Sequence, residues 1–465
     1  MGEGIKWMGS SRFLLVHGYG PHANLVTYYH HSQGYSRNHL IRSGQKRVPT
    51  VAARRLIGRI FETLFYAQIL LVSILTVFLT IRGFLSARRH HFHPAQWYPP
   101  LVSAAAASAA AALAWQRLVQ CSPRRALSVA FWLTPVLTFG AGVLLLCAES
   151  VAGLVIGVAS VISAIAIALY GCWVNRRFDY ASKVVSVSTA AVSSAETLCM
   201  TMVSVAVAFL YSGFTVCGIG GATTIMAAPD KVFIVIELLS FTWTMHVIKN
   251  ALLTTVSRIS YLSMACGVHM DPRLALRETA KYLIGSVSVG SMLVPFTGLL
   301  RGSARATAAV VGGHDEFLFS CAYCYSGVAS ALTSRANRWA FVQVGVYNKD
   351  FVAASADTWD SFRQSEMETL IDSDLTAVFC FLCGVAGGAT GSLVAGSWAL
   401  AVHKGYATSL LLYAFIIGYL MCRVAVAGAQ ACVQAYYIAY ADNPQSPQLD
   451  PTISARLQEM KRYRV

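Results

Sequence analysis

The sequence predicts an all-α, polytopic membrane protein with about ten transmembrane helices and both termini in the cytosol. First, 56% of the 465 residues are hydrophobic and only 12% are charged, about half the charged fraction of an ordinary soluble chain. Second, apolar stretches long enough to cross a bilayer as a helix recur along the chain. Third, Lys and Arg residues concentrate in alternate connections, which is the positive-inside pattern.

The expected elements follow the apolar stretches in order. Residues 1–59 are rich in Tyr, His and Arg without a sustained period, and we expect a mostly irregular cytoplasmic tail. Residues 60–440 form the transmembrane domain, and residues 441–465 form a cytoplasmic C-terminal tail. The spans are expected at 60–81, 100–119, 129–148, 151–173, 197–216, 232–254, 282–300, 317–345, 375–401 and 406–438.

Composition also excludes several kinds of partner. The formal net charge is +15, but topology accounts for this excess, so the lipid bilayer is the expected partner and nucleic acid is not. The pairs Cys321/Cys324 and Cys380/Cys383 have CxxC spacing in apolar segments without nearby His or acidic ligands. Buried free thiols are favoured over a zinc site or a redox pair, and we expect no cofactor or metal.

One expected span carries unusual polar residues. The stretch "FIVIELLSFTWTMHVIKNALLTT" contains Glu237, His246, Lys249 and Asn250. Polar groups at bilayer depth are costly, and they mark either a transport pathway or contacts between helices. Trp243, Asn250 and Thr254 share one helix face, which could line a polar cavity. The Lys249 side chain lies near enough to the inner boundary to reach the headgroups.

Other candidates leave alternatives open. Glu196, which heads the fifth span, is either a second functional carboxylate or a group that caps its helix. Gln430 and Gln434 are more typical of contacts between helices than of a substrate site. The glycines Gly387 and Gly391 favour static close packing, with a sliding gate as the alternative.

The connection between the eighth and ninth spans has its own pattern. The segment 351–370 carries apolar residues at helical spacing. This spacing predicts an amphipathic helix along the inner membrane face, which would form a cytosolic brace. No nucleophile elbow, P-loop or zinc-protease motif occurs in the chain, so we do not expect an enzyme.

Four stretches are similar to one known family: "FTWTMHVIKNALLTT" (241–255), "YLIGSVSVGSMLVPF" (282–296), "NRWAFVQVGVYNKDFVAASADTW" (337–359) and "AYADNP" (439–444). They resemble the choline transporter-like family of plasma-membrane proteins, and the third is the most specific. Asn348 stands where this family has glycine. The resemblance covers about residues 195–445. It implies ten spans, cytosolic termini and transport of choline or a related organic cation in the plasma membrane.

The residues supply chemistry that suits such a cation. A quaternary amine cannot donate hydrogen bonds, so its site needs aromatic faces and, in many cases, a carboxylate. We therefore expect the substrate to contact Trp243, Glu237, Asn250, Glu196, Tyr323 and Tyr347. Tyr325, Trp339 and Trp398 are further aromatic residues in or beside spans, although aromatic belts at membrane interfaces are common.

The leading hypothesis is a transporter of choline or a related organic cation, working by alternating access and driven by gradient and membrane potential. The alternatives are a non-transporting membrane scaffold, a lipid enzyme that uses His246, and a transporter of another amine such as ethanolamine. The sequence does not determine the exact substrate, the coupling ion or the oligomeric state, and an internal membrane would leave the same pattern.

Overall fold

The computed structural model describes residues 51–86, 94–311, 335–402, 404–446 and 449–462, together with residues 325, 327, 328, 331 and 332. Within these residues nine helices are long and apolar enough to cross a membrane. The chain is therefore an all-α polytopic membrane protein, which confirms the predicted fold class. The residues from Ala52 to the C-terminus form one compact unit, which contains these helices.

The helices up to the middle of the chain are α2 (Val51–Ser86), α3 (Pro94–Cys121), α4 (Pro123–Leu146), α5 (Val151–Val174), α6 (Phe178–Ala190), α7 (Ser194–Ile225), α8 (Ala228–Tyr261), α9 (Pro272–Glu278) and α10 (Ile284–Val311). They are followed by α12 (Ala340–Tyr347), α13 (Phe351–Gln364), α14 (Glu368–Asp372), α15 (Thr376–Val402), α16 (Ala407–Ala425), α17 (Ala427–Asp442) and α18 (Thr452–Arg462). Single turns of other helix types lie at Asn175–Arg177, Leu262–Cys266, Thr279–Leu283 and Lys404–Tyr406.

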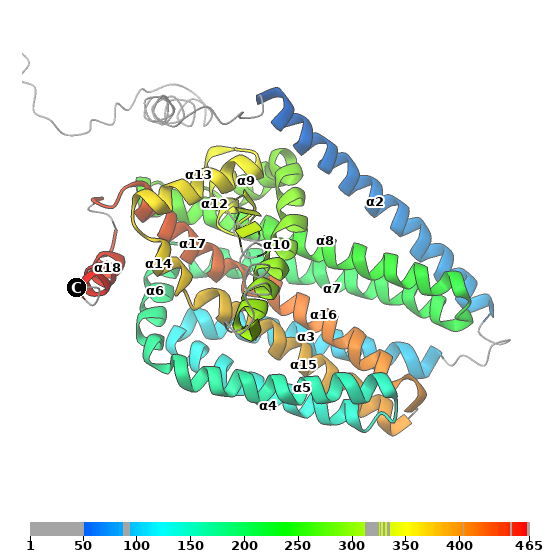
Figure 1. Ribbon diagram of the computed structural model, residues 1–465. Helices are drawn as coiled ribbons and strands as arrows, with labels where there is room; N and C mark the ends of the chain where they lie inside the picture. Colours follow the sequence, from blue (N-terminus) through cyan, green and yellow to red (C-terminus); the bar gives the residue numbers. More distant parts are fainter. Residues whose placement is uncertain are drawn as a thin grey trace, which may run out of the picture. The chain divides into compact units, whose positions relative to one another are not determined.

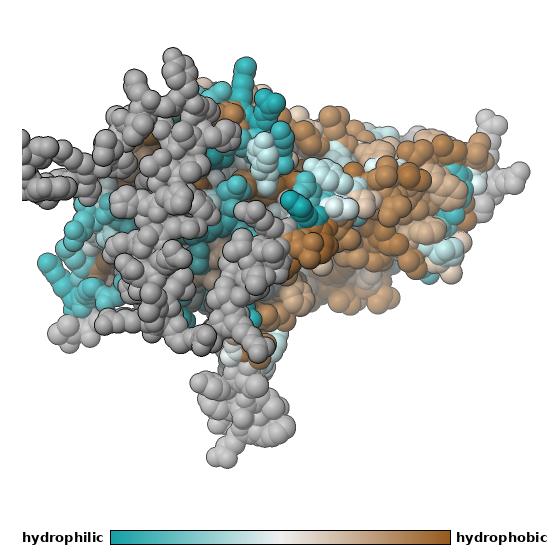
Figure 2. Space-filling model, turned by 90° about the horizontal axis from the view of Figure 1, so that it is seen from above, coloured by the Kyte–Doolittle hydropathy of each residue, from teal (hydrophilic) through white to brown (hydrophobic). Residues whose placement is uncertain are grey.

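Two ends of this bundle can be recognised in Figure 1. One end carries α6, α14 and α18, and we call it the α18 end. The other carries the α4–α5, α7–α8 and α15–α16 connections, and we call it the Glu149 end after the residue in the first of these. Hydrophobic residues gather toward the Glu149 end in Figure 2, whereas hydrophilic residues lie mainly toward the other end.

Lipid-facing surfaces can be assigned from exposed apolar side chains. On α2 the side chains of Leu70, Leu71 and Ile74 are 62%, 65% and 59% exposed, which water would penalise and lipid tails would not. By contrast, 67% of the apolar window of α15 is buried, the largest share among the nine candidate spans of the described residues. Helix α15 therefore occupies the interior of the bundle and α2 its margin.

Glycines on α15 explain its close packing against α16. A side chain at Gly387 would clash with the sulfur of Cys422, and one at Gly391 would lie 2.7 Å from the carbonyl oxygen of Ala414. Such small-residue faces let two helix backbones approach closely in a membrane. The structure thus shows Gly387 and Gly391 in close contacts between α15 and α16, as the packing interpretation predicts.

The prediction that the last span is one continuous helix is wrong. The segment 406–438 was expected to be one helix, but a turn at Val426 separates α16 from α17. Just after this turn, a side chain at Gly428 would lie 3.1 Å from the methyl group of Thr197 on α7. The helix is therefore interrupted just before the α17 backbone meets α7, and discontinuous helices of this kind are common in transporters.

Two other segments differ from their expectations. Residues 51–59 belong to α2, although an irregular tail was expected there, and residues 1–50 lie outside the described part of the chain. Residues 317–324 of the expected span 317–345 also lie outside it, and α12 accounts for the last part of that span. Within the C-terminal tail, α18 packs the fully buried side chain of Ile453 against the bundle.

The amphipathic segment 351–370 forms α13 and α14, but its apolar face contacts protein. Phe362, Met367 and Leu370 are completely buried, and the Phe362 ring meets that of Trp339 edge to face at 5.5 Å. The segment is thus a brace against α12 and its neighbours. Asn348, which precedes it, has a φ of 51°. This left-handed conformation suits Asn and Gly, so Asn can take the position that the resembling family gives to glycine.

Candidate functional site

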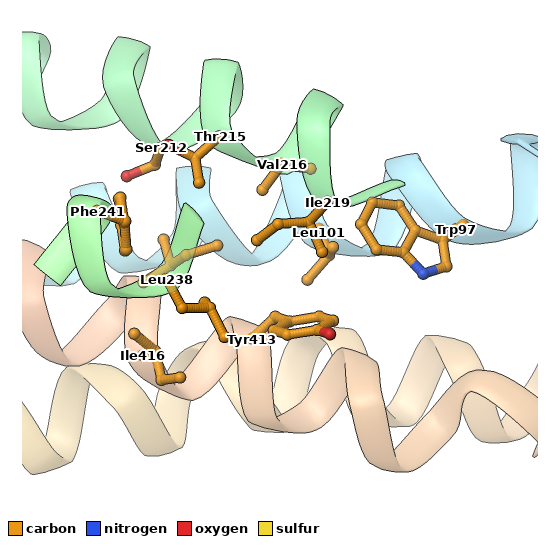
Figure 3. A pocket seen from close by; sticks show the side chains of 11 residues that line it. Trp97, Leu101, Ser212, Thr215, Val216, Ile219, Leu238, Phe241, Tyr413 and Ile416 are labelled. Carbon is orange, nitrogen blue, oxygen red and sulfur yellow. The ribbon is translucent and has the colours of Figure 1, made fainter. Parts of the chain in front are cut away.

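An aromatic pocket lies between α3, α7, α8 and α16 (Figure 3). Its wall consists of Trp97, Leu101, Ser212, Thr215, Val216, Ile219, Leu238, Phe241, Tyr413, Ile416 and Ile417. None of these side chains is charged. Because four helices contribute to it, the pocket would change shape whenever any of them moved.

Three rings surround this aromatic pocket. The Trp97 side chain is completely buried, and its ring centroid lies 6.3 Å from that of Tyr413. Phe241 stacks on Tyr211 with ring centroids 5.9 Å apart. Figure 3 shows Trp97 and Phe241 at opposite ends of the pocket, with Tyr413 on the α16 side. Aromatic faces in this arrangement present negative potential to a cation placed between them.

Two residues with hydroxyl groups, Ser212 and Thr215, line the pocket from α7. Ser212 donates its hydrogen bond to the carbonyl oxygen of Ala208 at 2.7 Å, and Thr215 donates to that of Tyr211 at 3.0 Å. Each donor is therefore used within the helix, and each hydroxyl oxygen keeps lone pairs that can accept a hydrogen bond. A ligand with one hydroxyl group could thus be oriented by α7.

The aromatic pocket is small. Its cavity volume is about 10 Å³, which is roughly what one water molecule needs. A quaternary amine is several times larger than water. Binding one would require α3, α7, α8 and α16 to separate or their side chains to rotate.

A glycine stretch of α7, residues 218–221, determines what can approach this helix. A side chain at Gly218 would lie 2.5 Å from Oε1 of Glu237, and one at Gly220 would lie 2.5 Å from the Tyr98 hydroxyl oxygen. A side chain at Gly221 would clash with the backbone of Leu79 on α2. The stretch therefore lets the α8 carboxylate, the α3 rings and the α2 backbone come close to the backbone of α7.

The carboxylate of Glu237 is completely buried beside Gly218, and Glu237 precedes the pocket residue Leu238 in the sequence. Its Oε1 accepts a hydrogen bond from the Thr76 hydroxyl of α2 at 2.8 Å. Its Oε2 has no hydrogen-bond partner among the described residues. A buried carboxylate with one unpaired oxygen needs a cation, a proton or water.

Helix α2 is joined to α8 by further polar contacts on both sides of Glu237. Toward the Glu149 end, Arg82 forms an ion pair with the buried carboxylate of Asp230. Toward the α18 end, the Gln68 amide donates to Thr244 at 3.2 Å and accepts from Ser240 at 2.6 Å. The side of α2 that faces the bundle is thus polar, while its other side carries the exposed apolar residues.

Trp243 and Asn250, two of the predicted substrate contacts, lie on the side of α8 that meets α10. The Trp243 ring nitrogen donates to the carbonyl oxygen of Ser288 at 3.3 Å, and its ring meets Phe65 at 5.7 Å. Asn250 is buried and donates to the Ser291 hydroxyl at 2.9 Å. The face predicted to line a cavity therefore contacts another helix, and neither residue lines the aromatic pocket.

The remaining predicted site residues lie elsewhere. Glu196 is exposed in the first turn of α7. Tyr347 ends α12 and donates to the Asp442 carboxylate at 3.0 Å. Tyr323 lies outside the described residues. Of the five predicted residues that the structure describes, Glu237 is nearest in sequence to the pocket wall, and none of the five is part of that wall.

Sequence reasoning missed Trp97, Phe241 and Tyr413. Trp97 and Tyr413 stand near the beginnings of α3 and α16, where aromatic residues are typical of interface belts, and Phe241 resembles an ordinary core residue. The glycines of the 218–221 stretch were an available signal, because closely spaced glycines in a span indicate close approach by other groups. They do not indicate which helix approaches.

These features define a multi-pass helical membrane protein with a buried aromatic pocket and a buried carboxylate on one of the helices that line it. The model of one protein family, described as "Plasma-membrane choline transporter", matches residues 158–445. The chain belongs to this family, as the sequence resemblance predicted.

Curated relatives support the same assignment. The chain is 25% identical over 231 residues to Protein PNS1 of Gibberella zeae, covering 46% of this chain and 43% of that protein. It is 27% identical over 220 residues to Protein PNS1 of Mycosarcoma maydis, covering 44% and 41%. It is 23% identical over 217 residues to a CTL-like protein of Dictyostelium discoideum, covering 44% and 38%. The chain thus matches half or less of the length of these relatives.

Proposed function

We propose that this protein is a transporter that moves choline or a related quaternary amine across the plasma membrane and catalyses no covalent change. The observation that carries the proposal is the aromatic pocket, whose three rings surround a space without charged side chains. A quaternary ammonium group has no N–H to donate, so aromatic rings are its natural partners. Each ring contributes about 0.5–2 kcal/mol, depending on desolvation.

The second support is the buried carboxylate of Glu237 on α8, one of the helices that line the pocket. Glu237 lies one residue before Leu238 of the pocket wall and has an unpaired oxygen. A permanent cation entering a low-dielectric bundle needs such a compensating charge. Of the predicted substrate contacts, Glu237 is therefore the one that we retain for the pocket. Trp243 and Asn250 remain candidates for a second position along α8, where they contact α10.

The proposed mechanism is alternating access driven by gradient and membrane potential. The small size of the pocket means that the surrounding helices must move to admit the substrate. Basic side chains gather at the α18 end, which supports a cytosolic location for that end. An inside-negative potential of 100 mV is worth about 2.3 kcal/mol per unit charge, which corresponds to roughly 50-fold accumulation of a univalent cation.

The test is uptake of radiolabelled choline into proteoliposomes under an imposed potential. Wild-type protein should show saturable uptake that tetramethylammonium inhibits, because an aromatic site accepts full methylation. Trp97→Leu should raise KM at least about threefold, the equivalent of one weak ring contact. The matched control is Trp398→Leu, which changes a tryptophan that is 42% exposed and outside the pocket.

Each result has a clear meaning. Uptake no greater than in empty liposomes would overturn the transport proposal and favour a scaffold. Uptake unchanged by Trp97→Leu would retain a transporter and exclude the aromatic pocket as its site. Inhibition by ethanolamine but not by tetramethylammonium would identify a site that recognises an ammonium by hydrogen bonds.

A further inference from the structure

Two basic side chains deep in the α18 half of the bundle have no acidic partner among the residues that the structure describes. They are Lys249 on α8 and Arg423 on α16, and we call them the basic pair. Each lies in the electrostatic field of the other. At 1.5 Å per residue, Lys249 lies about 18 Å along α8 from its end at Tyr261. Arg423 is followed by the whole of α17 before the chain leaves the bundle.

Local contacts hold both side chains at this depth. The stem of Arg423 crosses α15 at Gly384, where an added side chain would lie 2.9 Å from both Cγ and Cδ of the arginine. The Lys249 ammonium donates to Oδ1 of Asn250 at 3.2 Å, and Asn250 is itself tied to Ser291 on α10. Lys249 was expected to extend to the headgroups, but this contact turns it toward Asn250.

The neighbouring cations are already compensated. Arg338 pairs with Asp374 at 3.3 Å, and Arg301 pairs with Asp372 at 3.0 Å. Within the described residues, no carboxylate lies within ion-pair distance of Lys249 or Arg423. Uncompensated cations in a low-dielectric interior are strongly unfavourable. The basic pair therefore needs an anion that the described part of the chain does not supply.

We propose that the basic pair binds a phosphate group. A phosphate has the charge that two cations require, and its oxygens match the forked donors of an arginine. Lys249 has two ammonium hydrogens beyond its bond to Asn250. His246 lies one turn before Lys249 on α8 and within the electrostatic field of both members of the pair. All three side chains are half-buried, so part of each is accessible to a ligand.

The phosphate group has two possible sources: a phospholipid headgroup from the adjacent leaflet, or a free phosphate from the aqueous phase. The full-length protein in phosphatidylcholine nanodiscs allows both to be tested. Phosphatidic acid is added to the bilayer in one arm, and its retention is measured by native mass spectrometry. Inorganic phosphate is added to the buffer in the other arm, and its binding is measured by the thermal shift. Neither measurement depends on choline transport.

We expect saturable binding in at least one arm, weakened at least tenfold by Arg423→Gln and by Lys249→Met. Arg117→Gln, which changes an exposed arginine of α3, is the matched control and should bind as wild type does. Arg423→Lys keeps the positive charge but loses the forked N–H donors of the guanidinium group. The variant should therefore fold normally and bind the phosphate group more weakly. The arm that shows binding identifies the source.

A ligand-free measurement separates this role from a structural one. Without a phosphate ligand, Lys249→Met should melt at the same temperature as wild type or higher, because it removes an uncompensated charge. A lower melting temperature would mean that Lys249 already has an anionic partner in the protein, and it would overturn the proposal. Absence of binding in both arms, or equal binding by wild type and Arg423→Lys, would also overturn it.

Discussion

The hydroxyl groups of Tyr261 and Tyr347 lie 2.8 Å apart and join the ends of α8 and α12. Both also donate to one carboxylate oxygen of Asp442, at 2.9 and 3.0 Å, where α17 ends. Three helices that are distant in the sequence therefore meet in one hydrogen-bonded cluster at the α18 end. A transporter that opens at this end would have to break these hydrogen bonds or move the three helix ends together.

The first prediction concerns Tyr347→Phe. The change keeps the ring but removes one donor to Asp442, so stability should fall by about 0.5–1.5 kcal/mol. The apparent KM for choline should not change, because Tyr347 is no part of the pocket wall. Thermal melting and choline uptake by the same preparation provide the two measurements. A raised KM with unchanged melting would instead indicate that Tyr347 contacts the substrate, as the sequence suggested.

The second prediction concerns Glu237→Gln. The amide oxygen can still accept the hydrogen bond from Thr76, so the melting temperature should stay close to that of wild type. Choline uptake under a potential should fall at least tenfold, because the compensating charge is lost. Thr76→Val serves as the control, since it removes the hydrogen bond that Glu237→Gln keeps and leaves the carboxylate in place. Equal uptake by wild type and Glu237→Gln would exclude a role for this charge.

The third prediction concerns the ion pair at the Glu149 end. Asp230 is completely buried, while the side chain of its partner Arg82 is 27% exposed. Asp230→Asn should lower the free energy of unfolding by about 3 kcal/mol, because it leaves a cation without its partner. Adding Arg82→Gln should restore part of this loss. Chemical denaturation of the single and double variants measures the coupling, and purely additive effects would contradict the prediction.

The fourth prediction concerns the glycines between α15 and α16. Gly387→Ala introduces a methyl group against the sulfur of Cys422 and should cost about 1–3 kcal/mol. Gly213→Ala is the matched control, because an added side chain there meets no atom within 4 Å. It should be neutral or stabilise α7 by up to about 1 kcal/mol. If both variants melted alike, α15 and α16 would not be closely packed in the membrane.

Several features could be predicted from the sequence because they depend on local composition. Long apolar stretches specify spans without knowledge of their neighbours, since a helix satisfies its own backbone in lipid. The burial of Glu237 could be anticipated in the same way, because its neighbours in the sequence are apolar. The helical period also placed Trp243 and Asn250 on one face of α8, and the structure shows both in contact with α10.

What the sequence by itself determined is the class of protein: all-α, multi-pass, and a member of the choline transporter family. The tertiary structure alone decided which residues meet. Trp97, Phe241 and Tyr413 come from three helices, and the basic pair Lys249 and Arg423 comes from two. Periodicity specifies which face of a helix is apolar or polar. It does not specify which other helix covers that face, because association in lipid depends on the shape and hydrogen bonds of both partners.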